Sequence, residues 1–372
     1  MLSLIIADKS FSTRERSMLS RLEVGLADEG VRVVHAAPKD VPIDQMQSEG
    51  LQSTIVPYEE SSLPFRWRPS RHALHLLRAI TLADGEAPEI DIVHAFGASC
   101  WTLAVEVARL SNAALLLEVY KPSLVSAAAG RYAAIDRHQS APMFLTSEPA
   151  IASALAKSIP QARVISAPWG VHAPPAARTA ASLDQPLSLA ILFDTGESKP
   201  VAACLGGIVA AGPCLSESMI EMSISDASSS REARVWSAAR KAGLLDRVSI
   251  LPDMESRREP VLEMDLLLLP EPGGWERTFV LEAMARGVGV IAAADSTLDY
   301  LEDSTTARLV RGDTPAAWAA AIRELAENPR RLADLRAAAH NYIRTHRAPS
   351  THIEAVIKAY RMVARPEPAP TA

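Results

Sequence analysis

Glu282 is the charged residue of this sequence whose surroundings suggest the most specific chemistry. It lies within residues 266–293, LLLLPEPGGWERTFVLEAMARGVGVIAA, where an apolar strand is predicted to lead into a loop and Thr278 to cap the following helix. In open α/β sheets, ligands bind beyond the carboxyl ends of the strands, where helix N-termini attract anionic groups. A carboxylate one turn inside such a helix can accept hydrogen bonds from sugar hydroxyls beside a bound phosphate. The alternative is an exposed glutamate that the helix dipole favours.

The loop before this helix holds four further candidate residues. Gly273 and Gly274 allow the backbone to approach a ligand closely, or only form the turn. Glu271 and Glu276 lie on either side of the glycines and could contact a transferred group. The alternative is that both are solvated loop charges.

Short apolar runs alternate with longer amphipathic runs along the whole chain, a pattern typical of parallel βα units. The pattern predicts one series of strands near residues 2–6, 32–36, 53–56, 90–94, 113–119, 142–146 and 163–167. It predicts a second series near residues 187–193, 219–223, 247–251, 264–269, 288–292 and 307–310. A Pro-, Ala- and Ser-rich stretch without periodicity separates the two series and predicts a linker at residues 172–186. We therefore predict an α/β protein with domains at residues 1–171 and 187–348, and a disordered tail at residues 365–372.

Composition limits the classes of function. A length of 372 residues suits two domains, and 48% apolar with 22% charged residues is typical of a globular protein. The net charge of −6 argues against a nucleic-acid-binding platform. Three cysteines without metal-ligand spacing favour a reducing compartment, and the histidines show no ligand spacing either. The start of the sequence shows no basic leader, and no apolar run is long enough to span a membrane. We expect a cytoplasmic protein without a bound metal or other cofactor.

Residues 280–291, VLEAMARGVGVI, resemble the Leu-Glu-Ala-Met-Ala-x-Gly-Val-x-Val-Ile motif of the glycosyltransferase group 1 family, family 4 of the retaining enzymes. Residues 90–96, IDIVHAF, and 164–172, VISAPWGVH, are similar to the family's strand end and linker turn in the first domain. The resemblance implies the GT-B architecture, in which two Rossmann-like doubly wound domains face a cleft. It also implies an N-terminal acceptor domain, a C-terminal nucleotide-sugar domain, and a helix at residues 349–364 that returns to the first domain.

The family's reaction moves a sugar from a nucleotide-activated donor to an acceptor, here a glycan or a lipid-linked group, with retention of configuration. The resemblance implies that donor-binding residues are Glu282, Lys199, Gly273, Gly274, Thr278 and Glu271. It implies that catalytic residues on the transferred sugar and the acceptor side are Glu276, Tyr120 and His94. For His94, the alternative is a histidine whose polar atoms are satisfied within the core.

Several positions depart from the family pattern. Asp194 stands where the family has a phosphate-binding arginine, Gly274 where it has its first glutamate, and Tyr120 where it has a histidine. Residues 8–16, DKSFSTRER, lack the family's paired glycines. These departures favour an alternative function, a catalytically degenerate GT-B-like binding or partner subunit. A two-domain nucleotide-sugar epimerase is a third reading, which the helix motif fits less well.

Residues 65–80, FRWRPSRHALHLLRAI, predict a basic amphipathic helix preceded by aromatic residues. Such a segment can bind anionic lipid headgroups at the inner face of a membrane, or can pack on the core with a solvated basic face. The candidate membrane-contacting residues are Phe65, Trp67, Arg66, Arg68, Arg71 and Arg78.

Overall fold

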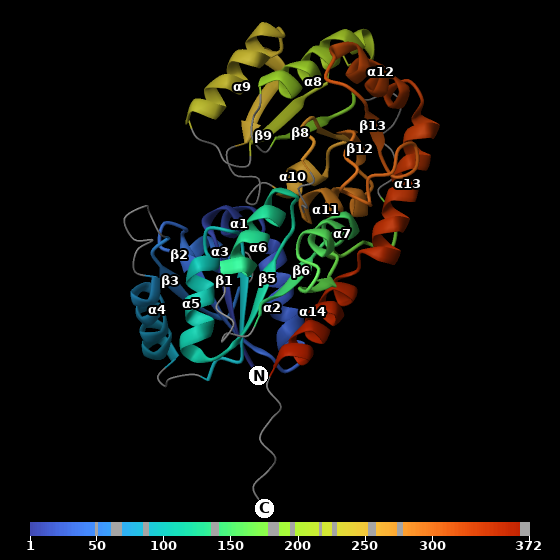
Figure 1. The fold of residues 1–372 in the computed structure, drawn as a ribbon. Helices are drawn as coiled ribbons and strands as arrows, with labels where there is room; N and C mark the ends of the chain where they lie inside the picture. The colour runs from blue at the N-terminus through green and yellow to red at the C-terminus, as the bar shows by residue number, and fades with distance from the viewer. Residues whose placement is uncertain are drawn as a thin grey trace, which may run out of the picture. The chain divides into compact units, whose positions relative to one another are not determined.

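The structure is a computed structural model and describes residues 1–48, 51–60, 69–84, 89–134, 141–177, 186–193, 198–215, 218–224, 229–251, 258–273 and 278–364 (Figure 1). The predicted tail at residues 365–372 and most of the predicted linker lie outside these residues. The chain divides into two compact units. Unit 1 comprises Met1–Trp169 and Pro349–Ala372, and unit 2 comprises Gly170–Ala348.

Unit 1 is built on a parallel sheet with the strand order β3-β2-β1-β4-β5-β6-β7. The central strands β1 and β4 are buried at every position, as expected for strands covered by helices on both faces of a sheet. The chain order reverses between β1 and β4, which creates the switch point of a Rossmann-like sheet. The strands are β1 (Leu2–Ala7), β2 (Arg32–Pro38), β3 (Thr54–Tyr58), β4 (Ile92–Phe96), β5 (Ala114–Glu118), β6 (Met143–Thr146) and β7 (Arg163–Ser166).

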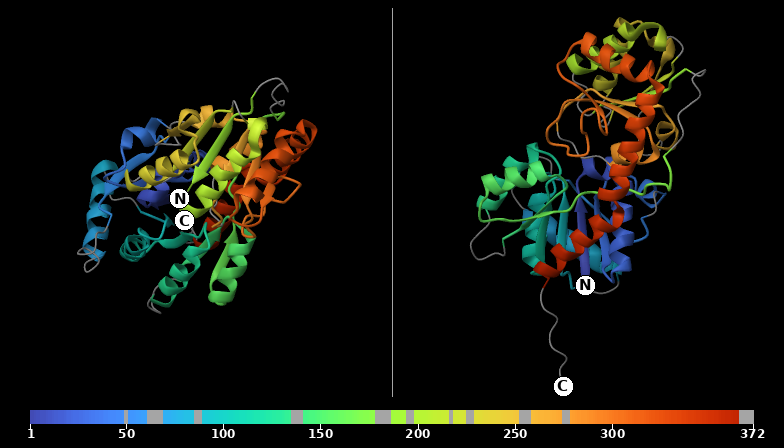
Figure 2. Two further views of the ribbon diagram at one scale, coloured as in Figure 1. Left: turned by 90° about the horizontal axis from the view of Figure 1, so that it is seen from above. Right: turned by 90° about the vertical axis from the view of Figure 1, so that its right-hand side faces the viewer.

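The helices of unit 1 lie on both faces of this sheet (Figures 1 and 2). They are α1 (Lys9–Arg14), α2 (Arg16–Asp28), α3 (Ile43–Ser48), α4 (Pro69–Asp84), α5 (Trp101–Ser111), α6 (Ser123–Ala134), α7 (Pro149–Ser158) and α14 (Pro349–Val363). The C-terminal helix α14 packs on α2 and runs diagonally across the strands in the right-hand view of Figure 2. Gly25 permits this approach, because a Cβ there would lie 2.4 Å from the side chain of Ile353.

Unit 2 repeats the same topology on a smaller scale, with the strand order β10-β9-β8-β11-β12-β13. Here the order reverses between β8 and β11, so the switch point lies at their carboxyl ends. The strands are β8 (Leu189–Phe193), β9 (Ile220–Ile224), β10 (Val248–Leu251), β11 (Leu266–Leu269), β12 (Gly289–Ala293) and β13 (Arg308–Val310).

The helices of unit 2 pack on this sheet around a core that includes Phe193, Ile291 and Trp318. Gly207 lets α8 and α12 pack closely, because a Cβ there would lie 2.3 Å from the Cβ of Trp318. The helical segments are α8 (Ser198–Ala211), η2 (Gly212–Leu215), α9 (Ser229–Lys241), η3 (Leu245–Arg247), α10 (Arg258–Leu262), α11 (Thr278–Arg286), α12 (Pro315–Ala326) and α13 (Pro329–His346).

Candidate functional site

Helix α11 carries a single charged side chain in its first two turns. From Thr278 to Ala285 every residue is buried except Glu282. The apolar residues must face the sheet and α13, so the sequence leaves the carboxylate at the one position that reaches partly toward solvent. The helix follows the loop after β11, so Glu282 lies near the switch point of the unit 2 sheet.

Arg258, the first residue of α10, holds this carboxylate. Both Nε and Nη2 of Arg258 donate to Oε2 of Glu282, at 3.0 and 2.8 Å. Nη2 also lies 3.4 Å from the Thr278 hydroxyl, and the guanidinium carbon lies 5.5 Å from the centre of the Phe279 ring. The side chains of Arg258 and Glu282 are only 8% and 15% exposed. Glu282 is therefore a fixed, largely desolvated carboxylate.

A second salt bridge joins the same two helices. Arg286, at the end of α11, donates from both terminal nitrogens to the Glu259 carboxylate, at 2.7 and 2.8 Å. Hydrogen bonding to Glu259 raises the pKa of the Arg286 guanidinium above its usual value. The short helix α10 is also anchored by Leu262, which is buried. Arg258 therefore projects from a segment that is tied to α11 by its neighbour Glu259.

The loop between β11 and α11 is described as far as Gly273. The Gly273 amide donates to Oδ2 of Asp295, at 2.9 Å, and Oδ1 of Asp295 accepts from the Thr297 amide at 2.8 Å. The loop is thus tied to the segment after β12. Glu271 is half-buried. Three positions named from the sequence, Asp194, Gly274 and Glu276, lie outside the described residues.

Lys199 lies in the first turn of α8, the helix that follows β8. Its side chain is 79% exposed, and its Nζ lies 3.3 Å from Oδ2 of Asp313 in the segment after β13. Because this pair is at the surface, it contributes little to stability. The Lys199 ammonium can therefore leave the Asp313 carboxylate and bind a phosphate at little cost in free energy.

His94 is placed in the core of unit 1 and not on an accessible surface. Its ring is fully buried, with Nδ1 3.0 Å from the Tyr360 hydroxyl and Nε2 3.3 Å from Oε2 of Glu118. Trp169 donates from Nε1 to Oε1 of Glu118 at 3.0 Å, and the Ser3 hydroxyl lies 2.9 Å from that of Tyr360. This buried polar network joins three strands to α14. It favours the structural alternative for His94.

Tyr120 is also buried, and its ring lies among other aromatic rings. The ring centres of Phe11 and Trp169 lie 5.3 and 5.5 Å away. Burial, followed by the charge of Asp8, raises the pKa of the Tyr120 hydroxyl well above its usual range. Tyr120 is therefore a neutral hydroxyl in an aromatic cluster, and an acceptor would reach it only after a rearrangement.

The first βα connection of unit 1 forms a helix in place of a glycine loop. Asp8 caps α1 by accepting from the Phe11 amide at 2.9 Å, and it accepts from the Ser99 hydroxyl at 3.0 Å. The chain at Gly97 has a φ of +95°, and a Cβ there would lie 1.9 Å from Oδ2 of Asp8. A carboxylate thus occupies the carboxyl end of β1, where an anion would be repelled.

Helix α4 carries the described part of the candidate membrane segment. Arg71 and Arg78 are exposed, as are two leucines, Leu74 at 44% and Leu82 at 85%. Phe65, Arg66, Trp67 and Arg68 lie outside the described residues. None of the helices that the structure describes is long and apolar enough to cross a membrane.

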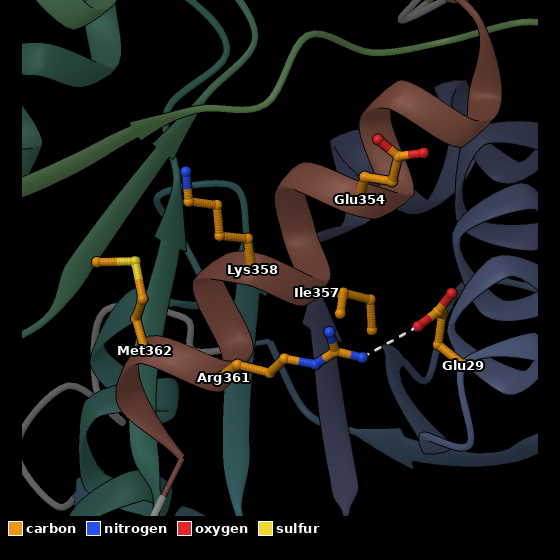
Figure 3. A pocket seen from close by; sticks show the side chains of 6 residues that line it. All are labelled: Glu29, Glu354, Ile357, Lys358, Arg361 and Met362. Atoms are coloured by element: carbon orange, nitrogen blue, oxygen red, sulfur yellow. Dashed lines mark hydrogen bonds and ion pairs between the residues drawn. The ribbon is translucent and has the colours of Figure 1, made fainter.

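A pocket of about 380 Å³ lies on α14 of unit 1, beside the end of α2 (Figure 3). Arg361 crosses it to reach Glu29 at 3.2 Å. Its lining residues are Glu29, Glu354, Ile357, Lys358, Arg361 and Met362. Because α2 runs antiparallel to the strands, its end lies at the amino edge of the sheet, away from the edge at which α/β proteins bind ligands. Among the described residues, no cluster of three or more His, Cys, Asp or Glu side chains could hold a metal ion.

Sequence reasoning named Glu282 but missed Arg258. The available signal was the pair of arginines at positions 257 and 258, a short distance upstream of the apolar run at residues 266–269. The structure brings Thr278 and Glu282 together around Arg258, while Lys199 is paired elsewhere at the surface.

The chain is similar to known proteins in sequence and in structure. Residues 224–328 match the family model described as Glycosyl transferases group 1, and no curated protein sequence matches the chain significantly. Sucrose-phosphate synthase from Thermosynechococcus elongatus is 14% identical, with a TM-score of 0.73 over 97% of this chain and 99% of that one. Anabaena HepE, solved with UDP-glucose, is 12% identical, with a TM-score of 0.72 over 97% and 99%.

The likeness extends beyond transferases. A putative UDP-N-acetylglucosamine 2-epimerase from Listeria monocytogenes is 13% identical, with a TM-score of 0.62 over 99% of both chains. At such identities the similarity shows the fold, and the predicted α/β class with two Rossmann-like domains is confirmed. The family match covers β11, α11 and β12, which surround Glu282. The predicted resemblance to the group 1 family is therefore confirmed at the level of fold and motif: the chain has the fold of GT-B glycosyltransferases, and residues 224–328 match the group 1 family model.

Proposed function

We propose that this protein is a retaining glycosyltransferase that takes a hexose from a nucleotide-activated donor bound to unit 2. The observation that carries the proposal is Glu282. It is the one incompletely buried residue in the first two turns of α11, it is held by Arg258, and it lies in the segment that matches the family model. In this role its carboxylate accepts hydrogen bonds from the ribose hydroxyls of the donor.

The remaining roles follow from charge. Cleavage of a nucleotide sugar leaves negative charge on the departing diphosphate, and fixed positive groups beside it stabilise the transition state. The N-terminus of α11 contributes partial positive charge. Lys199 contributes a full charge by exchanging Asp313 for a phosphate. Glu271 and Glu276, with Gly273 and Gly274, are proposed to contact the transferred sugar, and the acceptor to be a glycan or a lipid-linked group.

Donor binding should raise the unfolding temperature. Because a ligand that binds only the native state stabilises it by mass action, about 2.7 kcal/mol is expected at a nucleotide concentration of about 100 Kd. A thermal-shift panel of UDP, GDP and ADP with their glucose conjugates measures this. The proposal requires at least one compound of the panel to raise the unfolding temperature. A flat response to every compound would contradict it.

A non-catalytic binding or partner protein is the second candidate, favoured by the burial of Tyr120 and by Asp8 at the carboxyl end of β1. The two candidates differ in turnover. A transferase should release free nucleoside diphosphate from the nucleotide sugar that it binds, at a rate that rises when an acceptor is added. A binding protein would bind the same compound and leave it intact. Chromatography of the incubated nucleotide sugar separates the two outcomes.

We also propose peripheral membrane binding through α4 and the residues before it. The observation is that Arg71, Leu74, Arg78 and Leu82 are all exposed on one helix. Each basic side chain near an anionic surface contributes about 1 kcal/mol, so four arginines would hold the protein weakly and reversibly. Vesicles of anionic lipid should bind the protein, less so at high salt, and neutral vesicles should not. Changing Arg66, Arg68, Arg71 and Arg78 to Ser should abolish cosedimentation. Equal binding by this variant would reject the surface.

A further inference from the structure

We infer that Arg258 is a positioning residue for nucleotide recognition, which acts on the ribose hydroxyls through Glu282. This inference rests on the proposed function and identifies a residue on α10 on which the site depends. Its basis is that one guanidinium contacts three side chains of the first turns of α11: Thr278, Phe279 and Glu282.

The geometry fixes the carboxylate rather than merely neutralising it. Nε and Nη2 of Arg258 both donate to the same oxygen, Oε2 of Glu282, at 3.0 and 2.8 Å. Two donors from a rigid planar group on one acceptor restrict rotation of the glutamate side chain. The Phe279 ring, 5.5 Å from the guanidinium carbon, restricts the arginine in turn. A lysine, with one nitrogen, could neutralise the charge but would fix the orientation less well.

The attachment of α10 to α11 does not depend on this pair. Arg286 and Glu259 join the two helices by a bidentate salt bridge, and Leu262, at the end of α10, is buried. A largely buried ion pair is weak evidence for stability, because desolvation of both charges offsets their attraction. The desolvated Arg258–Glu282 pair is therefore not needed to attach α10 to α11, because the Arg286–Glu259 salt bridge already does so. What the Arg258–Glu282 pair provides is a carboxylate held in a fixed orientation beside the start of α11.

The proposed experiment measures the affinity of UDP, GDP and ADP, and of the 2′,3′-dideoxy form of each, for the full-length chain by calorimetry. For the nucleotide that binds the parent, Arg258→Met should weaken binding by about 10-fold or more, the value of a hydrogen bond to a charged group. The dideoxy form lacks the hydroxyls that Glu282 contacts, so its affinity should be the same for the parent, Arg258→Met and Glu282→Gln. Arg258→Lys should recover only part of the loss.

Arg286→Met is the matched control, because it removes the other salt bridge between the same helices and leaves the contacts of Glu282 in place. It should bind all nucleotides like the parent. If Arg258→Met weakens the dideoxy form as much as the natural nucleotide, Arg258 acts on the phosphates or on the fold, and the inference is overturned. If Glu282→Gln loses affinity and Arg258→Met does not, the inference fails while the proposed function stands. If the parent binds none of the three nucleotides, both fail.

Discussion

Replacing Trp169 by Ala should lower the free energy of unfolding of unit 1 by about 3–5 kcal/mol, as is usual for removing a large buried aromatic side chain. Trp169 is fully buried against Tyr120 and Phe11, and its Nε1 donates to the buried carboxylate of Glu118. The variant loses packing and also removes a donor from a buried charge. Urea denaturation followed by circular dichroism measures the change.

A pair of Phe variants separates packing from hydrogen bonding. Trp169→Phe keeps most of the ring but removes the bond to Glu118, and hydrogen bonds to charged groups are worth about 1.5–3 kcal/mol. Trp101 is equally buried, yet its Nε1 has no hydrogen-bond partner among the described residues. Trp101→Phe should therefore lower the free energy of unfolding clearly less than Trp169→Phe does. Equal losses would mean that the bond from Trp169 to Glu118 contributes nothing.

Arg336→Met should destabilise unit 2 by about 3–5 kcal/mol, because it removes the cation from a buried carboxylate. Nη2 of Arg336 donates to the backbone oxygen and to Oδ1 of Asp265, at 2.6 and 3.2 Å, and both side chains are 5% exposed. Asp265 also accepts from the amide and hydroxyl of Ser188, so it joins the starts of β8 and β11 to α13. The loss should appear as a lower urea midpoint.

Arg331→Met is the matched control on the same helix. Its guanidinium lies 3.8 Å from Glu324, and both side chains are about one-third exposed. Surface pairs of this kind contribute about 0–1 kcal/mol, so the control should stay within that range. If Arg331→Met and Arg336→Met lower the free energy of unfolding by similar amounts, burial does not make the Arg336–Asp265 pair more stabilising than a surface pair.

The strands could be predicted from the sequence because each is a short apolar run between turn residues. The run at residues 266–269, LLLL, has only one reading in an alternating α/β pattern, and β11 is found there. Helices were harder to delimit. Between β1 and β2 the structure has two helices, α1 and α2, with a break at Glu15. The first of them is set by the Asp8 cap, a local hydrogen bond to the Phe11 amide that apolar periodicity does not reveal.

The site could be predicted only in part. Glu282 was recognisable because the residues around it form a continuous motif on one helix. Arg258 was not, because α10 has only five residues, too few to show a period, and its contacts with α11 join residues 20 or more positions apart. His94 illustrates the opposite difficulty. From the sequence alone, a histidine at a strand end could contact a ligand. In the structure, its two nitrogens lie within hydrogen-bond distance of Glu118 and of Tyr360, which is 266 positions away.

The central claim, that a nucleotide binds unit 2 through Glu282, is tested most directly by calorimetric titration of the parent and Glu282→Ala with the nucleoside diphosphate that gives the largest thermal shift. We expect saturable binding to the parent and a loss of affinity of about 10-fold or more in the variant, with unchanged circular dichroism. Equal affinity of the two proteins would contradict the assignment of Glu282 and, with it, the donor site.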